Sequence, residues 1–312
     1  MTATPLAPGP EFDRIRAFAA ALGTAGAGLG DDCAVLGDGW CVSTDATVEG
    51  IHFRRGWLAP EEIGWRATMA ALSDLAAMGA TAEAVLVAMV APVEEPAAAL
   101  TAVMAGVGAA VGEVGARVVG GDLNGGPVLM LTVTVLGRAE RPVYRRGARP
   151  GEDLCVTGTL GGARAAWRAG DGGAIPSAAA RIRFARPWPR IREGQWLAGH
   201  GATAMIDLSD GLAGDARHLA LASGVGLEIE VDLVPTDPSV GGADPAVEAT
   251  IGGEDYELLV TLPAGGADRS SRELVAHGGV ALTRIGRVVE GSGVRFLRGG
   301  EELAVRGFDH FR

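Results

Sequence analysis

The chain has 312 residues, of which 48% are hydrophobic, and carries a formal net charge of −11. This length allows two domains of ordinary size, and the hydrophobic fraction excludes global disorder. The acidic balance, with no basic stripe, argues against a nucleic-acid binder. All side-chain cations other than histidine are arginines, because the sequence contains no lysine.

The three cysteines, Cys33, Cys41 and Cys155, form no CxxC pair. This pattern predicts small buried side chains in a reducing cytosol, and argues against a disulfide framework or a structural zinc site. Residues 1–10 lack the basic region and apolar core of a signal peptide, and the longest apolar runs are far shorter than the ~20 residues of a membrane span. We therefore expect a cytoplasmic protein without a membrane partner.

The sequence pattern of the first half of the chain predicts helices that alternate with strands. An amphipathic pattern over residues 11–22 indicates a helix, and the Asp38-Gly39 turn between residues 33–36 and 40–43 predicts a β-hairpin. Pro60 and the acids after it mark the start of a helix that stops at Gly79. The remaining elements expected here are a helix over 96–114 and strands over 84–90, 117–119 and 128–136, the last two flanking a Gly-Gly-Asp loop.

Residues 145–151 are polar and contain Gly and Pro, which is typical of a domain boundary. We therefore expect an N-terminal domain over residues 1–142 and a C-terminal domain over residues 143–312. Hairpins beside helical crossovers predict mixed sheets, so the expected fold class is α/β of the α+β type, with two mixed-sheet domains. The later elements are strands over 153–157, 202–206, 226–231 and 257–262, a strand pair within 281–296, helices over 163–168, 187–199, 212–222 and 269–277, and a long loop over 235–253.

Five aspartate-bearing segments are the most informative feature of the sequence. A carboxylate at the edge of a core is costly to desolvate unless arginine, backbone N–H groups or a metal meets it. Carboxylates beside hydroxyl oxygens, without a His or Cys cluster, suit Mg²⁺, which in enzymes usually holds substrate phosphates. The sequence therefore indicates a phosphoryl-transfer enzyme. The segments are Gly30-Asp31-Asp32, Ser43-Thr44-Asp45, Ser73-Asp74, Gly120-Gly121-Asp122 and Asp207-Leu208-Ser209-Asp210-Gly211.

Asp74 is the sharpest single indication of a site. It is expected inside a helix among Leu and Ala residues, where a charge needs a metal, helix-end donors or an arginine. A buried ion pair with Arg66 is the structural alternative. For the other segments the alternatives are ordinary turns and, at Ser209 or Asp210, a helix cap.

Known phosphate-binding motifs narrow the class of enzyme. A P-loop is excluded because GxxxxGK[ST] requires a lysine, and the protein-kinase motifs are missing. Arg145 and Arg146 are candidates for nucleotide phosphates, or else solvated linker charges. His52 and the acids of Glu254-Asp255 are weaker candidates, because a lone His is more often a packing residue and acids at a strand entry often cap it.

Together these segments resemble the thiamine-monophosphate kinase family, in an order and spacing that hold from about residue 11 to 311. The wider superfamily includes aminoimidazole ribonucleotide synthetase, selenophosphate synthetase and a hydrogenase maturation protein. The motifs that carry the resemblance are Gly28-Leu29-Gly30-Asp31-Asp32-Cys33-Ala34, the segment from Ser43 to Phe53, Leu72-Ser73-Asp74-Leu75-Ala76-Ala77-Met78-Gly79, Gly120-Gly121-Asp122, Tyr144-Arg145-Arg146-Gly147-Ala148, the segment from Ile206 to Leu212, and Gly252-Gly253-Glu254-Asp255-Tyr256-Glu257-Leu258.

The resemblance implies an ATP-dependent kinase that converts thiamine monophosphate to thiamine diphosphate, the last step of thiamine diphosphate biosynthesis, with several Mg²⁺ ions and no side-chain base. It also implies a homodimer whose N-terminal, ATP- and metal-binding halves contribute strands to a barrel between subunits. Carried over by motif, the Mg²⁺ ligands would be Asp32, Ser43, Thr44, Asp45, Asp74, Asp122, Asp207 and Asp210. ATP would contact Gly121, Asp122, Arg145 and Ser209, and thiamine monophosphate would contact His52, Glu254 and Phe308.

Two positions depart from the family's usual pattern. Its Pro-x-Pro-Arg stretch is Pro187-Trp188-Pro189-Arg190 here, with a bulky Trp. Phe308 stands where the family often has Tyr or Trp, so an aromatic platform for the substrate ring survives without a hydroxyl contact.

Two other functions compete with this interpretation. One is another ATP-using member of the superfamily that acts on an amide or a selenide. A selenide would call for a reactive Cys or selenocysteine near the N-terminus, and no cysteine precedes Cys33. The second is a non-catalytic nucleotide- or metal-binding regulator, which loss of one or two aspartates would favour, yet all of them are present.

Overall fold

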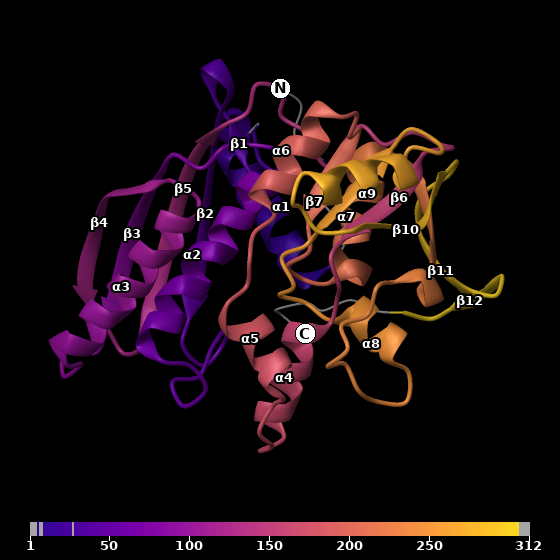
Figure 1. The fold of residues 1–312 in the computed structure, drawn as a ribbon. Helices are drawn as coiled ribbons and strands as arrows, with labels where there is room; N and C mark the ends of the chain where they lie inside the picture. The colour runs from indigo at the N-terminus through magenta and orange to yellow at the C-terminus, as the bar shows by residue number, and fades with distance from the viewer. Residues whose placement is uncertain (1–4, 6–8, 27, 306–312) are drawn as a thin grey trace.

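The computed structural model describes residues 5, 9–26 and 28–305. In this part of the chain two mixed sheets form, one from each half, with helices packed against them (Figure 1). The first sheet has the order β1-β2-β5-β3-β4, in which β3 and β4 are parallel and the other neighbours antiparallel. Its strands are β1 (Ala34–Val35), β2 (Trp40–Val48), β3 (Ala84–Ala91), β4 (Arg117–Gly125) and β5 (Met130–Arg138).

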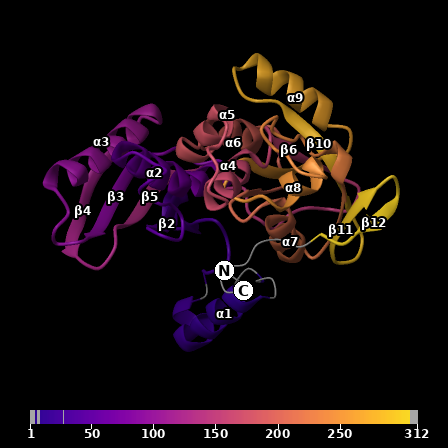
Figure 2. The same ribbon diagram turned by 90° about the horizontal axis from the view of Figure 1, so that it is seen from below.

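Two helices, α2 (Pro60–Ala77) and α3 (Ala97–Glu113), cover one side of this sheet (Figure 2). The start of α2 is fixed by Pro60 and by Glu62, whose Oε2 accepts from the Ala59 N–H at 2.9 Å. The two helices approach closely because Gly64 and Gly106 face the partner backbone. A Cβ at Gly64 would lie 1.9 Å from the Val103 carbonyl oxygen. Most of α2 is thereby buried, including the turn that carries Asp74.

The second sheet has the order β12-β11-β8-β10-β6-β9-β7. Only β11 and β8 are parallel in it, so both sheets are mixed, as the sequence predicted. Helices α7 (Leu212–Ser223) and α9 (Ala267–Ala276) lie on opposite sides of this sheet (Figure 2). The strands are β6 (Asp153–Thr157), β7 (Ala204–Asp207), β8 (Gly226–Glu230), β9 (Leu258–Leu262), β10 (Leu282–Val289), β11 (Gly293–Arg298) and β12 (Glu301–Leu303).

The helices of this half surround the sheet and reach toward α2. A Cβ at Gly194 of α6 would lie 2.1 Å from the Ala76 carbonyl oxygen, so α6 packs directly on the end of α2. Near the start of the chain, α1 (Pro10–Leu22) meets α7 through the rings of Phe12 and His218, 4.2 Å apart. The helices are α4 (Gly162–Asp171), α5 (Ala178–Ala185), α6 (Ile191–Gly199), α7 (Leu212–Ser223), α8 (Pro245–Ile251) and α9 (Ala267–Ala276).

Several expected elements are wrong in detail. The Gly120-Gly121-Asp122 segment is no loop, because β4 runs through it to Gly125. The strands within 281–296 do not pair with each other, since β8 lies between β10 and β11. The expected loop over 235–253 contains α8. The sequence patterns did not predict α5.

Asp45 lies inside β2, because that strand continues beyond the expected end at residue 43 to Val48. The hairpin of β1 and β2 forms as expected, with Asp38 at a φ of 60° in its turn. The segment that joins β5 to β6 contains residues 142 and 143, and the domain boundary proposed there stays a prediction. Among the described residues, no helix has the length and apolar composition that crossing a membrane requires.

Candidate active site

A cavity of about 360 Å³ opens between the two halves of the chain. Its walls come from β2 and the loop after it, from α2 and α4, and from the loops that follow β7 and α8. The lining is strongly acidic. The lining residues are Thr44, Asp45, Ile51, His52, Ala70, Asp74, Arg164, Trp167, Asp207, Ser209, Asp210, Gly253, Glu254 and Tyr256.

Three of the predicted aspartates converge at this site. Asp32 lies just before β1, Asp74 in α2 and Asp207 at the end of β7, and one carboxylate oxygen from each lies within 4.8 Å of the others. Burial, and then the charge of Asp207, raise the pKa of Asp74 well above its ordinary value. Burial, and then the charge of Asp32, raise the pKa of Asp207 to about 7. Ionising these carboxyl groups together is therefore costly in the metal-free chain, and a bound cation would relieve that cost.

Arg145 supplies one counter-charge to this cluster. Its Nη2 lies 2.7 Å and its Nε 3.3 Å from Asp32 Oδ1. The Oδ2 atoms of both Asp31 and Asp32 are buried and find no hydrogen-bond partner among the described residues. Burial, and then the charge of Asp32, raise the pKa of Asp31 to about 6. Arg145 therefore neutralises only part of the cluster.

Strand β2 presents its polar residues on two faces. Ser43 donates its hydroxyl to Asp74 Oδ2 at 2.5 Å, which ties β2 to α2 beneath the cluster. Asp45, two residues on, shares the face of Ser43, and burial raises its pKa. The Thr44 hydroxyl instead lies 3.1 Å from the Thr134 hydroxyl on β5. The side chain of Thr44 is thus turned away from Ser43 and Asp45, although the residue still lines the cavity.

A second group of possible ligands follows β7. One ligand atom each from Asp210, Asp215 and His218 lies within 4.8 Å of the others. The Asp210 N–H donates to Asp215 Oδ2 at 3.2 Å. Burial, and then the charge of Asp210, raise the pKa of Asp215 well above its ordinary value, while burial lowers the pKa of His218 to about 3.

The loops that carry Ser209 and Glu254 are fixed against each other by backbone contacts. The Glu254 N–H donates to the Ser209 carbonyl at 2.7 Å. A Cβ at Gly253 would lie 2.6 Å from the same carbonyl oxygen. Glu254 and Tyr256 adopt φ values of 68° and 53°, in the left-handed region that is unfavourable for such residues. Strained backbone of this kind is typical of functional sites, and here it directs both side chains to the cavity.

The contacts of Arg66 show whether Asp74 belongs to a buried ion pair or to a possible metal site. Its guanidinium forms an ion pair with Glu254 and lies 4.1 Å over the ring of Phe184. The ion pair between Arg66 and Asp74 that was the structural alternative is therefore wrong. Asp74 instead faces Ser43 and the other aspartates.

His52 also lines the cavity, close to Asp45. Its Nδ1 accepts from the Val48 N–H at 3.1 Å, which fixes the ring beside the loop. Because Nδ1 is an acceptor, a neutral His52 carries its proton on Nε2.

Two predicted positions stand apart from the cavity. Gly121 and Asp122 lie on β4, separated from β2 by β5 and β3, at the outer edge of the first sheet (Figure 1). At about 4.8 Å per strand, this places them well over 10 Å from β2. Asp122 Oδ2 accepts from Asn124 there at 2.6 Å. Phe308 lies outside the described residues.

The donor set fits a hard divalent cation. Asp32, Asp74 and Asp207 offer oxygen ligands at close range, one of them through an orphaned buried oxygen, with the Ser43 hydroxyl beside them. Oxygen-only sites of this kind favour Mg²⁺ over zinc or copper. The arrangement can hold such an ion next to bound phosphates.

Four residues in or beside the cavity were not among the candidates predicted from the sequence. Asp215 and His218 are three apart on α7, a spacing that places them on one helix face and could have been recognised. Arg164 and Trp167 have the same spacing on α4 and both line the cavity. Nothing in their local sequence distinguishes them from ordinary surface residues, so only the tertiary structure identifies them.

The two-domain fold and its carboxylate-lined cavity define the class of protein. Residues 30–139 match the family model of the AIR synthase related protein N-terminal domain. Residues 149–298 match the model of the corresponding C-terminal domain. Together these matches cover most of the chain, which therefore belongs to the AIR synthase related proteins.

Within that class the chain belongs to the thiamine-monophosphate kinase family. It is 37% identical over 291 residues to the thiamine-monophosphate kinase of Mycobacterium tuberculosis, covering 88% of this chain and 82% of the relative. It is 36% identical over 326 residues to that of Salmonella typhimurium, covering 96% and 95%. A solved structure described as AaThiL complexed with AMPPCP and TMP superposes with a TM-score of 0.86 at 31% identity, covering 96% and 97%.

Proposed function

We propose that this chain phosphorylates thiamine monophosphate at the carboxylate-lined cavity, with ATP as phosphoryl donor and thiamine diphosphate as product. It is a phosphotransferase of the thiamine-monophosphate kinase family. The observation that carries the choice of site is the convergence of Asp32 with Asp74 and Asp207, the latter two of which line that cavity. The structural relative that holds an ATP analogue and TMP supports the pair of substrates.

The nucleophile in this reaction is an oxygen of the acceptor's own phosphate group. Its second pKa is about 6, so it is largely ionised near neutral pH and needs no side-chain base. The aspartates serve as ligands, and the task of the protein is to align two anions and screen their repulsion. Mg²⁺ held by Asp32, Asp74, Asp207 and their neighbours would supply that screening.

The other proposed contacts divide between donor and acceptor. We assign Ser209 and Arg145 to ATP, and Arg145 would exchange its bond with Asp32 for one to phosphate. We assign His52 and Glu254, which both line the cavity, to thiamine monophosphate. Phe308 would add an aromatic surface to the acceptor side.

Gly121 and Asp122 enter this proposal through a second copy of the chain. Every residue of β4 is exposed, and the strand presents Val119 at 57% and Leu123 at 63% exposure. An open edge with apolar side chains is a liability that proteins usually cover. We propose a homodimer in which the first sheets of two subunits form a barrel and Asp122 of one subunit faces the other subunit's cavity.

Three further expectations belong to the same proposal. Residues 1–142 act as the metal-binding and dimerisation domain, and residues 143–312 complete the site. Several Mg²⁺ ions take part. The protein works in the cytoplasm, in keeping with three free, buried cysteines.

A product assay tests this function. The purified protein is incubated with ATP, Mg²⁺ and thiamine monophosphate, and ADP and thiamine diphosphate are quantified together. The proposal requires equal amounts of both. ADP formation without thiamine diphosphate would reject the acceptor and favour another ATP-using reaction, and absence of both would favour a regulator.

A further inference from the structure

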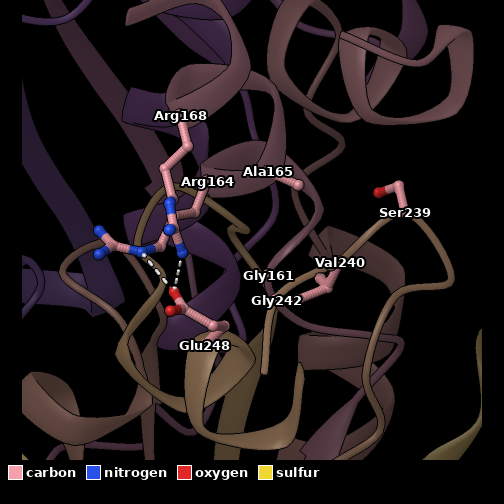
Figure 3. Close-up of a pocket in the computed structure, with 9 residues that line it drawn as sticks. Gly161, Arg164, Ala165, Arg168, Ser239, Val240, Gly242 and Glu248 are labelled. Carbon is pink, nitrogen blue, oxygen red and sulfur yellow. Dashed lines mark ion pairs between the residues drawn. The ribbon is translucent and has the colours of Figure 1, made fainter. Parts of the chain in front are cut away.

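Helix α4 presents two residues of different chemistry to the cavity. Arg164 and Trp167 are three residues apart, so they lie on the same face of the helix, and both line the cavity. Arg168, one residue further along, lines only a smaller neighbouring pocket of about 190 Å³ (Figure 3). One face of α4 is therefore directed at the candidate active site.

Arg164 is the one permanent cation among the residues that line the larger cavity in the described part of the chain. Five carboxylates line the same cavity, namely Asp45, Asp74, Asp207, Asp210 and Glu254. A bound phosphomonoester adds a charge of about −1.5 to −2 to this surface. A guanidinium with its planar fork of donors is the side chain best suited to bind such a group.

The present partner of Arg164 holds it only loosely. Arg164 Nε lies 3.6 Å from Glu248 Oε2, whereas Arg168 Nη1 lies 2.5 Å from the same oxygen (Figure 3). The buried Arg164 Nε makes no hydrogen bond within the described chain. If Arg164 turned toward a phosphate, Glu248 would keep Arg168 as its partner, so the change leaves no isolated charge.

Trp167 is held in place by an aromatic cluster. Its ring lies 5.0 Å from that of Trp57, edge to face, and 5.9 Å from that of Phe184. A rigid indole on the wall of a cavity offers a surface for aromatic rings and for organic cations, which bind Trp better than other aromatic side chains.

We propose that this face of α4 recognises the acceptor, with Arg164 binding its phosphate group and Trp167 packing against its cationic ring system. The two residues act as positioning residues and orient the acceptor's phosphate toward the aspartate cluster. This inference rests on the proposed function, because it takes the acceptor to be a phosphomonoester of an organic cation.

The first test compares Arg164→Gln with two variants of its neighbours. Arg164→Gln should raise the KM for thiamine monophosphate about tenfold and leave the KM for ATP unchanged. Arg168→Gln, which removes the same charge from the same helix outside the cavity, should change either KM less than about twofold. Glu248→Gln should lower the KM for thiamine monophosphate, because it releases Arg164 from its competing anion.

Arg164→Gln and Glu248→Gln should thus shift the KM for thiamine monophosphate in opposite directions. If the ion pair served only the stability of the fold, loss of either partner would destabilise the protein in the same way and would not produce this difference. Equal KM increases in both variants, or an unchanged KM in Arg164→Gln, would overturn the assignment of Arg164. Melting temperatures of all variants, measured alongside, identify any that fail to fold.

The second test concerns the ring. Trp167→Leu should raise the KM for thiamine monophosphate about fivefold or more, while the same change at Trp188, a partly exposed indole outside the described cavity lining, should not. If the wild-type protein forms no thiamine diphosphate, the proposed function itself fails. If it does and Trp167→Leu keeps the wild-type KM, only the role of Trp167 is refuted.

Discussion

Arg145 lies in the segment that joins the first sheet to the second, and it forms a buried ion pair with Asp32. Asp32 precedes β1, the first strand of the first sheet. The Asp32 side chain is 0% exposed and that of Arg145 17% exposed. The pair joins the two halves of the chain at the aspartate cluster. It also places the residue that we assign to ATP in contact with one that we assign to the metal.

Removal of Arg145 should therefore destabilise the free protein strongly. We expect Arg145→Ala to lower the free energy of unfolding by about 3 kcal/mol, because it leaves the buried charge of Asp32 without a partner. Chemical denaturation of the metal-free protein measures this. The double variant Arg145→Ala/Asp32→Asn should recover most of the loss, and a double variant as unstable as the single one would contradict the explanation.

Replacement of Asp74 should separate activity from stability. Asp74→Asn keeps the size of the side chain and removes the cost of burying an ionisable carboxyl group. We expect turnover to fall at least about a hundredfold while the melting temperature in EDTA rises by about 2–4 °C. Asp232→Asn, which loses an exposed carboxylate paired with Arg298, is the matched control and should alter neither quantity.

The stability of the metal-free protein should fall as the pH rises. Burial raises the pKa of Asp207 and of Asp255 to about 7. Each group binds its proton more tightly in the folded chain, so its stabilising contribution is complete below about pH 4 and is lost as the pH rises through 7. Lowering of the His218 pKa from 6.5 to about 3 has the opposite sign, but it acts only below about pH 6.5.

Melting temperatures in EDTA between about pH 6.5 and 8 isolate the carboxylate contribution. We expect a decline over this range, a flatter profile for Asp207→Asn, and a larger stabilisation by Mg²⁺ at pH 8 than at pH 6. A metal-free melting temperature that rises from pH 6.5 to 8 would show that these carboxyl groups titrate normally in the folded chain.

Asp122 offers a test of the proposed dimer. Asp74→Asn and Asp122→Asn should each be inactive alone if one residue comes from each subunit. Mixed in equal amounts and allowed to exchange subunits, they should regain about a quarter of the wild-type activity, because half of the dimers are mixed and each of these has one intact site. No recovery, despite verified exchange, would show that Asp74 and Asp122 do not form a site shared between two subunits.

Local sequence patterns predicted the fold well where packing agrees with them. Pro60 and the acids after it predicted the start of α2, and the Asp38-Gly39 turn predicted the hairpin of β1 and β2. The apolar surroundings of Asp74 indicated a buried carboxylate. They failed at Gly120-Gly121, because Gly121 permits close strand contact: a Cβ there would lie 2.0 Å from the Val87 carbonyl oxygen. Glycine usually marks a turn, yet here it lets β4 pack against β3.

Local sequence patterns could not predict which strands pair with each other when they are far apart in the chain. The insertion of β8 between β10 and β11 depends on contacts between segments far apart in the chain. The same limit applies to the site. The sequence could list the aspartates, but that Arg66 pairs with Glu254 and Arg145 with Asp32 follows only from the tertiary structure.

We propose that Asp32, Asp74 and Asp207 hold a divalent cation when both substrates are bound. The most direct measurement is a Mn²⁺ titration followed by electron paramagnetic resonance, with a non-hydrolysable ATP analogue and thiamine monophosphate present. We expect tight Mn²⁺ binding to the wild-type complex and a loss of bound Mn²⁺ in Asp74→Asn and Asp207→Asn. Equal Mn²⁺ binding by the wild-type protein and both variants would contradict it.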